Sequence, residues 1–321
     1  MALPMQVAVV GAGLMGHALA IDFAIRGCTV RISDADTARL DDLPERLRAR
    51  LQPLIAAGYL DAESGAAVAD RIDPVGDIAD AVRDATYVVE AISERLEAKQ
   101  QLFEQLEAAA PSTAIFASNT SGLRATDLSV GLAHPERLIV AHYFNPPYLI
   151  PVVEIVPGER TRQDVVDATC EFLRAIGKEP VLLRREAPGF IANRLQAALL
   201  REAIHLVATG VATAEDIDTV MSGAVGRRLT SMGPFQVLDF AGVDVWAQIG
   251  AYLFPDLDCS DAAQAYLQQL VESGRSGVKA GAGVYSWPPG DVAAVSARRD
   301  RELLHCIQRD SPAGGSTKER G

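Results

Sequence analysis

The sequence predicts an α/β protein, in which a doubly wound, mostly parallel sheet is followed by an all-α C-terminal domain. Three observations support this fold class. Short apolar runs alternate with helical patterns over the first 187 residues, which is typical of parallel sheets. A glycine-rich sextet stands between the first apolar run and the first helix. After Pro188 the strand patterns end and only helical periodicity remains.

The predicted strands are short apolar runs, as expected of strands that are buried on both faces of a sheet. The first run ends at the glycine-rich sextet and the second ends at Asp34, so that they form a strand–helix–strand unit of about 30 residues. In chain order, the predicted strands are Met5–Val10, Thr29–Ser33, Thr86–Ala91, Ala114–Ser118, Leu138–Phe144, Val152–Val156 and Val181–Leu183.

The helices expected between these strands are Leu14–Arg26, Leu96–Ala109 and Arg162–Ile176. Residues 36–70 form too long a segment for a plain connection between a strand and the next element. Their pattern indicates two polar helices with a turn at Gly58. We therefore expect an inserted helical hairpin at about residues 36–70.

The predicted domain boundary separates residues 1–187 from residues 188–309. The second domain is expected to be helical throughout, with helices at Phe190–Thr209, Ala214–Val220 and Gln236–Ala251. Residues 310–321 are dominated by glycine, serine and charged residues, so we expect them to form a disordered tail.

The composition of the chain argues against some classes of partner and indicates a cellular compartment. A net charge of −12 argues against nucleic acid as a partner, because a phosphate-binding face needs clustered Lys and Arg. The four cysteines lack the spacing of a zinc site or a disulfide framework, so we expect reduced thiols and no metal. His17 and Asp22 interrupt the apolar stretch Val7–Ile25, which also lacks a basic leader. We therefore expect a cytoplasmic protein that does not enter a membrane.

The sextet Gly11-Ala12-Gly13-Leu14-Met15-Gly16 has the GxGxxG pattern of dinucleotide-binding loops, in the strand–loop–helix context that this pattern requires. Gly11 permits the tight turn, Gly13 lets the backbone approach a pyrophosphate, and Gly16 allows the helix to pack closely on the strand. Asp34 follows 18 residues after Gly16, where an acid binds the ribose hydroxyls and repels a 2′-phosphate. We predict a Rossmann-type domain that binds NAD; a glycine turn beside a solvated aspartate is the alternative.

The candidate catalytic pair is His142 and Glu154. Asn145-Pro146-Pro147 breaks the apolar pattern between two predicted strands, and a chain that folds back around Tyr148 places His142 opposite Glu154. A carboxylate beside an imidazole fixes its tautomer and stabilises its protonated form, which suits a general base for a hydroxyl proton. A structural ion pair is the alternative interpretation.

Two further polar positions are candidates for substrate contact. The segment Ser118-Asn119-Thr120-Ser121 follows a strand end, where ligands bind in parallel sheets, although a plain polar turn also has this composition. Asn193 lies in an otherwise apolar helical segment, so it either caps a neighbouring element or meets a ligand.

Together these features resemble the 3-hydroxyacyl-CoA dehydrogenase family. The resemblance runs from Val9 to about Trp287, nearly the whole chain, and its ordered set of motifs is highly specific. The motifs are GAGLMG (11–16), VVEAISE (88–94), SNTS (118–121), HYFNPP (142–147), GKEP (177–180), PGFIANRL (188–195), GPFQVLD (233–239) and GVKAGAGVYSW (277–287).

The resemblance implies an NAD-dependent dehydrogenase with a role for each matching residue. His142 would be the catalytic base, Glu154 its orienting acid, and Ser121 and Asn193 would hold the substrate oxygen. The resemblance also implies a homodimer formed through the helical domain, which would contribute to substrate binding. The residues implied to bind NAD are Gly11, Gly13, Leu14, Met15, Gly16, Asp34, Glu94, Lys99, Asn119, Asn145 and Lys279.

The motifs combine features of more than one branch of this family. HYFNP and SNTS resemble the acyl-CoA branch, whereas NPPYLIPVVEIVP and NRLQAALLREAIHLVATG resemble the branch of L-gulonate 3-dehydrogenase and the lambda-crystallins, a style that L-carnitine dehydrogenases share. The acyl-CoA branch grips CoA at the inserted hairpin, which here carries Arg46, Arg48 and Arg50 among several acids. Arg227 and Arg228 are either a clamp for a free carboxylate or charges at an interface or on the surface.

Three functions follow as hypotheses. The first is reversible oxidation of a short-chain 3-hydroxyacyl-CoA, such as 3-hydroxybutyryl-CoA, to the 3-keto product, as in fatty acid metabolism. The second is the same hydride chemistry on a free acid such as L-gulonate, L-carnitine or a cyclic hydroxy or aldehyde acid. The third is a crystallin-like structural protein with residual NAD binding, against which the intact His142–Glu154 pair argues.

Overall fold

The computed structural model describes residues 6–310. Contacts between residues divide the chain into two compact units: the first extends to Ala192 and resumes at Ala297, and the second is Asn193–Ser296. Within residues 6–310, no helix combines the length and the apolar character needed to cross a membrane.

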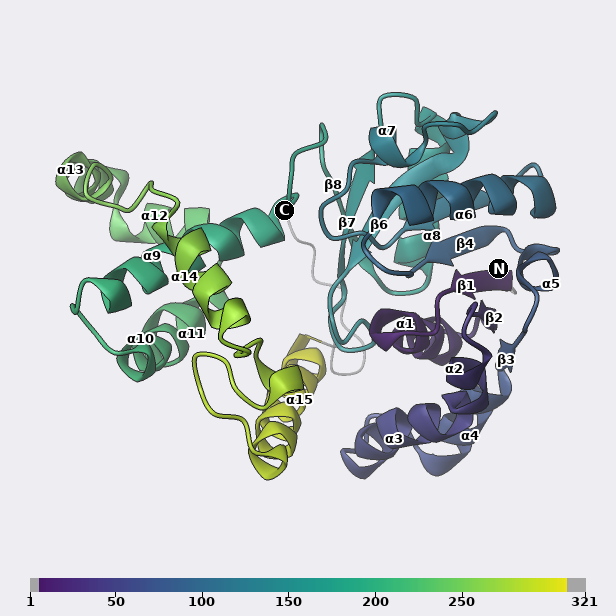
Figure 1. The fold of residues 1–321 in the computed structure, drawn as a ribbon, viewed down its shortest axis with the longest axis horizontal. Helices are drawn as coiled ribbons and strands as arrows, with labels where there is room; N and C mark the ends of the chain where they lie inside the picture. Colours follow the sequence, from purple (N-terminus) through teal and green to yellow (C-terminus); the bar gives the residue numbers. More distant parts are fainter. Residues whose placement is uncertain (1–5, 311–321) are drawn as a thin grey trace. The chain divides into compact units, whose positions relative to one another are not determined.

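The first unit is built on one eight-stranded sheet with the strand order β3-β2-β1-β4-β5-β6-β7-β8 (Figure 1). All neighbouring strands are parallel except β6 and β7, which are antiparallel. The structure thus confirms the predicted doubly wound, mostly parallel sheet. The strands are β1 (Gln6–Val10), β2 (Thr29–Ser33), β3 (Ile72–Pro74), β4 (Tyr87–Glu90), β5 (Ile115–Ser118), β6 (Leu138–Tyr143), β7 (Val152–Pro157) and β8 (Glu179–Leu182).

Helices cover both faces of this sheet because the side chains of each strand alternate between two cores. Val7 and Val9 of β1 belong to the core that includes α1, α3, α4 and α8. Ala8 and Val10 belong to the core that includes α5, α6 and α7. These helices, with the short α2, are α1 (Leu14–Ile25), α2 (Thr37–Asp41), α3 (Leu43–Ala56), α4 (Ala62–Asp70), α5 (Ile78–Val82), α6 (Leu96–Ala109), α7 (Ala125–Leu128) and α8 (Gln163–Ala175).

The inserted segment contains three helices where the sequence predicts two. α2 is a single short helix, capped by the Asp36 carboxylate, which accepts a hydrogen bond from the Ala38 N–H. α3 and α4 then form a hairpin whose turn passes through Gly58, at a φ of +71° that favours glycine. The hairpin leads into β3 and α5, which the sequence analysis missed. β3 has three residues and ends in Pro74. A strand this short has no recognisable apolar pattern.

The second unit is helical, apart from isolated β-bridges at Gly277, Ala282 and Ser286. The predicted helix Gln236–Ala251 is wrong as a single element, because Gly242 (φ +98°) separates α12 from α13. The helices of residues 192–310 are α9 (Ala192–Ala208), α10 (Ala214–Val220), a π-helix (Met221–Val225), α11 (Gly226–Leu229), α12 (Pro234–Ala241), α13 (Val243–Leu253), α14 (Ala262–Glu272), a 3-10 helix (Val278–Ala280) and α15 (Pro289–Asp310).

The last helix belongs to both units. α15 begins in the second unit, and from Ala297 onward it belongs to the first, where Leu304 is buried in the same core as α1. The compact units therefore divide five residues later than the predicted boundary at 187/188, and the C-terminal end of the chain does not follow the predicted division. Asp310 ends α15, and the rest of the predicted tail lies outside the described residues.

Candidate active site

The glycine loop connects β1 to α1 at the carboxyl end of the sheet. Gly11 has a φ of +103°, and its N–H donates to the Ser33 carbonyl at 2.7 Å. A Cβ on Gly11 would lie 2.6 Å from the Ala91 carbonyl oxygen, and one on Gly16 would lie 1.6 Å from the Gly11 carbonyl oxygen. Neither backbone atom can move aside, so both positions require glycine.

Gly13 occupies a different environment, with open space in front of the loop. A Cβ there would meet only the Arg39 Nη1 atom, at 3.8 Å. Gly13 is also the N-cap of α1, which has no side-chain cap, so the first N–H groups of this helix are available to an anion. The loop therefore fits a pyrophosphate, and Leu14 (57% exposed) and Met15 form its first helical turn.

Asp34 lies beside this loop at the end of β2. Its Oδ2 accepts the Ala12 N–H at 2.7 Å, and its Oδ1 accepts the Asp36 N–H at 2.9 Å. A cavity of about 560 Å³ opens here, and its lining includes Gly11, Asp34, Asp77 and Gln101. Its place at the strand ends, between the glycine loop and an acid, fits the adenosine half of a dinucleotide.

His142 and Glu154 are paired across β6 and β7, as the sequence predicts. The His142 Nδ1 lies 2.8 Å from the Glu154 Oε2, and both residues are buried. A carboxylate can only accept a hydrogen bond, so Nδ1 carries the proton and the Nε2 of the neutral ring has a free lone pair. Phe144 and Phe190 flank the imidazole, with ring centroids at 4.7 and 5.6 Å.

The second oxygen of Glu154 is held by the backbone. The N–H groups of Ile191 and Ala192 both donate to Oε1 at 2.9 Å. Burial works to raise the pKa of Glu154, but the hydrogen bonds from His142 and from these two N–H groups lower it below its ordinary value. Phe190 precedes them in the left-handed region (φ +53°), which costs on the order of 1–3 kcal/mol in a non-glycine residue. The carboxylate is thus fixed on both sides and stays ionised.

A second cavity, of about 360 Å³, contains the candidate catalytic histidine. Met15 of the glycine loop lines it, so that the cofactor loop and the histidine share one space. Asn119 also lies here, and its Oδ1 accepts the Tyr143 N–H at 2.9 Å, which joins the ends of β5 and β6. The predicted site residues in this lining are Met15, Glu94, Asn119, Ser121, His142 and Asn145.

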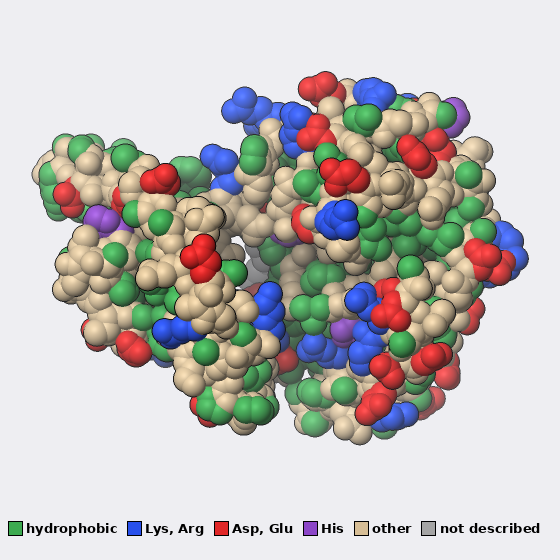
Figure 2. Space-filling view, viewed as in Figure 1, with side chains coloured by type: hydrophobic (Ala, Val, Ile, Leu, Met, Phe, Trp, Pro, Cys, Tyr) green, Lys and Arg blue, Asp and Glu red, His purple; other side chains and the backbone are tan. Residues whose placement is uncertain are grey.

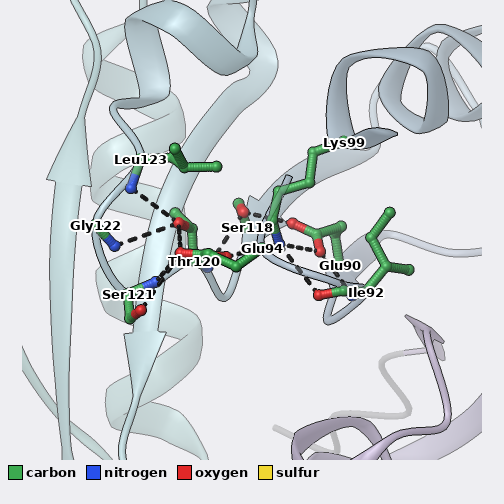
Figure 3. Close-up of polar contacts among 9 residues, drawn as sticks. All are labelled: Glu90, Ile92, Glu94, Lys99, Ser118, Thr120, Ser121, Gly122 and Leu123. Atoms are coloured by element: carbon green, nitrogen blue, oxygen red, sulfur yellow. Dashed lines mark hydrogen bonds and ion pairs between the residues drawn. The ribbon is translucent and has the colours of Figure 1, made fainter. Parts of the chain in front are cut away.

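A polar network that is buried at Lys99 and Glu90 includes two residues of this lining, Glu94 and Ser121 (Figure 3). The Lys99 side chain is 1% exposed, and its ammonium lies 2.5 Å from the Glu90 carboxylate and 3.3 Å from the Glu94 carboxylate. Figure 3 shows Glu94 between this ion pair and Thr120 and Ser121. The Glu94 Oε1 accepts the Thr120 hydroxyl at 2.5 Å and the Ser121 N–H at 2.9 Å.

This network determines the charge and position of Glu94. Burial works to raise the pKa of Glu94, but the Thr120 hydroxyl, the Lys99 charge and the Ser121 N–H lower it. The Ser121 Oγ lies 3.3 Å from the same carboxylate oxygen. Lys99 is therefore enclosed beneath Glu94, and its predicted contact with the dinucleotide stays a prediction.

Four predicted site residues belong to the second unit. Asn193 is half-buried in the first turn of α9, directly after the Ala192 N–H that binds Glu154. Arg227 and Arg228 are exposed on α11, and Lys279 is exposed in the short 3-10 helix Val278–Ala280. Their roles at the site stay predictions.

Several residues contribute to the site in ways that the sequence does not predict. Arg39 contacts Asp34 from α2, and it was not predicted. Arg46, which the resemblance placed at a CoA-binding hairpin, instead donates to the Ala12 carbonyl of the glycine loop. Asp77 lies in the turn between β3 and α5, two elements that were not predicted. The N–H donors to Glu154 belong to the PGFIANRL motif, but backbone donors leave no trace in residue type.

Comparison with family models covers almost the whole chain. Residues 6–187 match the model described as "3-hydroxyacyl-CoA dehydrogenase, NAD binding domain". Residues 189–287 match "3-hydroxyacyl-CoA dehydrogenase, C-terminal domain".

Curated relatives of the chain carry several different names. The chain is 33% identical over 302 residues to a 5-formyl-3-hydroxy-2-methylpyridine 4-carboxylate 5-dehydrogenase of Mesorhizobium japonicum, covering 93% of this chain and 96% of the relative. It is 42% identical over 241 residues to an L-carnitine dehydrogenase of Streptomyces griseus, covering 74% and 70%. It is 40% identical over 236 residues to a lambda-crystallin homolog of Bos taurus, covering 73% and 74%.

Solved structures show the same spread of substrates. The crystal structure of an enzyme of the same name as the Mesorhizobium relative, described as an NAD+-dependent dismutase, superposes with a TM-score of 0.88 at 31% identity and covers 96% of this chain and 98% of that one. The 3-hydroxybutyryl-CoA dehydrogenase of Escherichia coli K12 gives a TM-score of 0.71 at 34% identity, covering 89% and 60%.

Proposed function

The chain belongs to the 3-hydroxyacyl-CoA dehydrogenase family and is an NAD-dependent dehydrogenase, and on that premise we propose that it oxidises the hydroxyl group of a free carboxylic acid. The observation that carries the proposed chemistry is the buried His142–Glu154 pair, which shares a cavity with Met15 of the glycine loop. The relatives named after free acids support the substrate class.

The histidine acts as a general base in this proposal. Bound NAD supplies the hydride acceptor at its nicotinamide. The Nε2 of His142 takes the proton of the substrate hydroxyl, and the charge that develops on the ring is stabilised by the Glu154 carboxylate 2.8 Å from Nδ1. Ser121, held by Glu94, and Asn193 are proposed to bind the reacting oxygen of the substrate.

The environment of Arg46 in the inserted hairpin is a second argument for a free acid over a CoA thioester. The guanidinium of Arg46 is engaged with the Ala12 and Arg39 carbonyls. The phosphates of CoA would need free cations here, and the segment carries Asp41, Asp42 and Glu45 close by. We propose instead that Arg227 and Arg228 bind the carboxylate of the substrate.

A 3-hydroxyacyl-CoA is the second candidate substrate. It is favoured by the name of the matching family models and by the likeness to the 3-hydroxybutyryl-CoA dehydrogenase structure. The short-chain 3-hydroxybutyryl-CoA is the member of this class to test, and its turnover would place the enzyme in fatty acid metabolism.

A substrate panel tests the proposal. We expect NADH formation, followed by its absorbance, with one or more of L-carnitine, L-gulonate and cyclic hydroxy or aldehyde acids. His142→Gln should lower kcat/KM by about 10²- to 10⁴-fold, the usual contribution of a general base. Turnover of 3-hydroxybutyryl-CoA alone would favour the second candidate. No NADH from any substrate would favour a crystallin-like structural role, and full activity of His142→Gln would remove the catalytic assignment.

Further parts of the proposal concern the cofactor contacts, the assembly and the location. We propose that the dinucleotide binds the glycine loop, Asp34, Glu94, Asn119, Asn145 and Lys279. The described cysteines are all free thiols, which fits a cytoplasmic location. We also propose a homodimer formed through the helical unit, where Figure 2 shows hydrophobic side chains gathered over α12 and α13.

A further inference from the structure

Arg39 lies over the glycine loop, in the space between Gly13 and Asp34. Its Nη1 lies 3.4 Å from the Asp34 Oδ2, and its Nε lies 3.5 Å from the Asp36 Oδ2. The same Nη1 is 3.8 Å from the position that a Cβ on Gly13 would occupy. The Arg39 side chain is 53% exposed, so part of it faces solvent at the edge of the loop.

The backbone of Arg39 is fixed in this position by a second arginine. Arg46 on α3 donates to the Arg39 carbonyl and, from its Nη1, to the Ala12 carbonyl at 2.7 Å. Arg46 thus ties α2 to the glycine loop at Ala12. Figure 2 shows Lys and Arg side chains among acidic ones in the region of α1 and α2. Arg39 is therefore a cation held beside the loop rather than a freely placed surface side chain.

Asp34 is the anion that faces this cation. Its side chain is 9% exposed, and its carboxylate is fixed by the Ala12 and Asp36 N–H groups. An acid at this strand end accepts hydrogen bonds from the ribose hydroxyls of NAD. In proteins that bind NADP, an arginine nearby accommodates the 2′-phosphate. This chain carries both groups, 3.4 Å apart.

We propose that Arg39 is a specificity-determining residue that forms one half of a 2′-phosphate site. The Asp34 carboxylate beside it prevents a phosphate from binding there. With Asp34 ionised, its carboxylate repels a 2′-phosphate and neutralises Arg39, so NAD is preferred. Without that charge, the guanidinium is free to bind a phosphate through charge-assisted hydrogen bonds. The inference rests on the proposed placement of the adenosine ribose at Asp34.

The test measures binding of NADH and NADPH to the purified full chain by titration calorimetry, so it does not depend on the substrate. Asp34→Asn keeps an acceptor for the Ala12 N–H and removes the charge. We expect it to weaken NADH binding and to tighten NADPH binding by about tenfold or more. Adding Arg39→Ala should cancel the gain for NADPH while changing the affinity for NADH much less.

The matched control adds Arg83→Ala to Asp34→Asn. Arg83 is also an exposed arginine that pairs with two acids, Asp80 and Asp84, but it contacts neither the loop nor Asp34. This control should keep the gain for NADPH. Asp34→Ser serves as a second background, and thermal unfolding checks that each variant folds.

The outcomes separate this inference from the proposed cofactor site. An equal affinity for NADPH with and without Arg39, in both Asp34 backgrounds, would overturn the role of Arg39 while leaving the NAD site intact. Unchanged NADH binding in both Asp34 variants would overturn the ribose site and this inference with it.

Discussion

At the scale of single residues, Glu154 connects the candidate catalytic histidine to the backbone of the chain. One carboxylate oxygen binds the His142 ring, and the other accepts two N–H groups that follow Phe190. The carboxylate therefore has two functions. It sets the tautomer of His142, and it fixes the turn that leads from the sheet into α9.

Glu154→Gln removes the negative charge of this residue and keeps the shape of its side chain. An amide cannot stabilise a protonated imidazole as a carboxylate does, so we expect kcat to fall by about 10²- to 10⁴-fold with a smaller change in KM. The pH dependence of stability should change as well. The pKa of Glu154 is lowered below its ordinary value, so the stabilisation from its charge is present above the ordinary pKa and is lost as the pH falls through the lowered value.

Urea unfolding between pH 3 and pH 7 measures this effect, with the range chosen to span the ordinary glutamate pKa of about 4.3. The wild-type free energy of unfolding should fall more steeply on acidification than that of Glu154→Gln. Parallel curves for the two proteins would show that folding does not lower the pKa of Glu154.

At the scale of elements, Lys178 joins three parts of the first unit. Its buried ammonium lies 2.6 Å from the Asp22 Oδ2 on α1 and donates to the Pro147 carbonyl at 2.5 Å. It also donates to the Ile150 carbonyl at 3.2 Å. These two carbonyls belong to the connection between β6 and β7, the strands that carry His142 and Glu154. Burial lowers the pKa of Lys178, and Asp22 opposes this shift.

Lys178→Met should destabilise the protein strongly. The substitution leaves the buried Asp22 carboxylate with Arg26 as its remaining cation, and breaking a buried ion pair costs about 3–5 kcal/mol. Chemical denaturation measures the loss. Asp22→Asn combined with Lys178→Met should recover part of it, because the uncompensated charge is gone. A loss below about 1 kcal/mol, the value of an exposed pair, would contradict this account.

At the scale of the whole molecule, the second unit exposes large apolar side chains. Phe235 and Phe240 on α12 are 80% and 85% exposed, and Tyr252 and Phe254 are also exposed. Apolar surface of this extent marks an interaction site. The proposed homodimer would bury it.

Phe240→Asp tests the dimer. A charge placed in an apolar interface is left without a partner, so we expect the variant to elute as a monomer where the wild type elutes as a dimer. Light scattering after gel filtration gives the mass of each. Val130→Asp, at an exposed apolar position of the first unit, is the matched control and should stay dimeric. A monomeric wild type would rule out the dimer at the concentration tested.

The sequence by itself determined the sheet, the glycine loop and the pairing of His142 with Glu154. Each of these depends on local patterns: buried parallel strands are continuous apolar runs, and a short break between two strands fixes which residues face each other. The three-residue β3 and the division at Gly242 were not predicted, because short elements carry too little periodicity.

Only the tertiary structure decided what surrounds the site. Arg39 and Arg46 reach the cofactor loop from an inserted helical segment, and the Ile191 and Ala192 N–H groups reach Glu154 across 37 and 38 residues of chain. Such contacts depend on packing between elements that are far apart in the sequence. Residue type alone does not record them, because a backbone N–H is common to almost every residue and an exposed arginine has many possible partners.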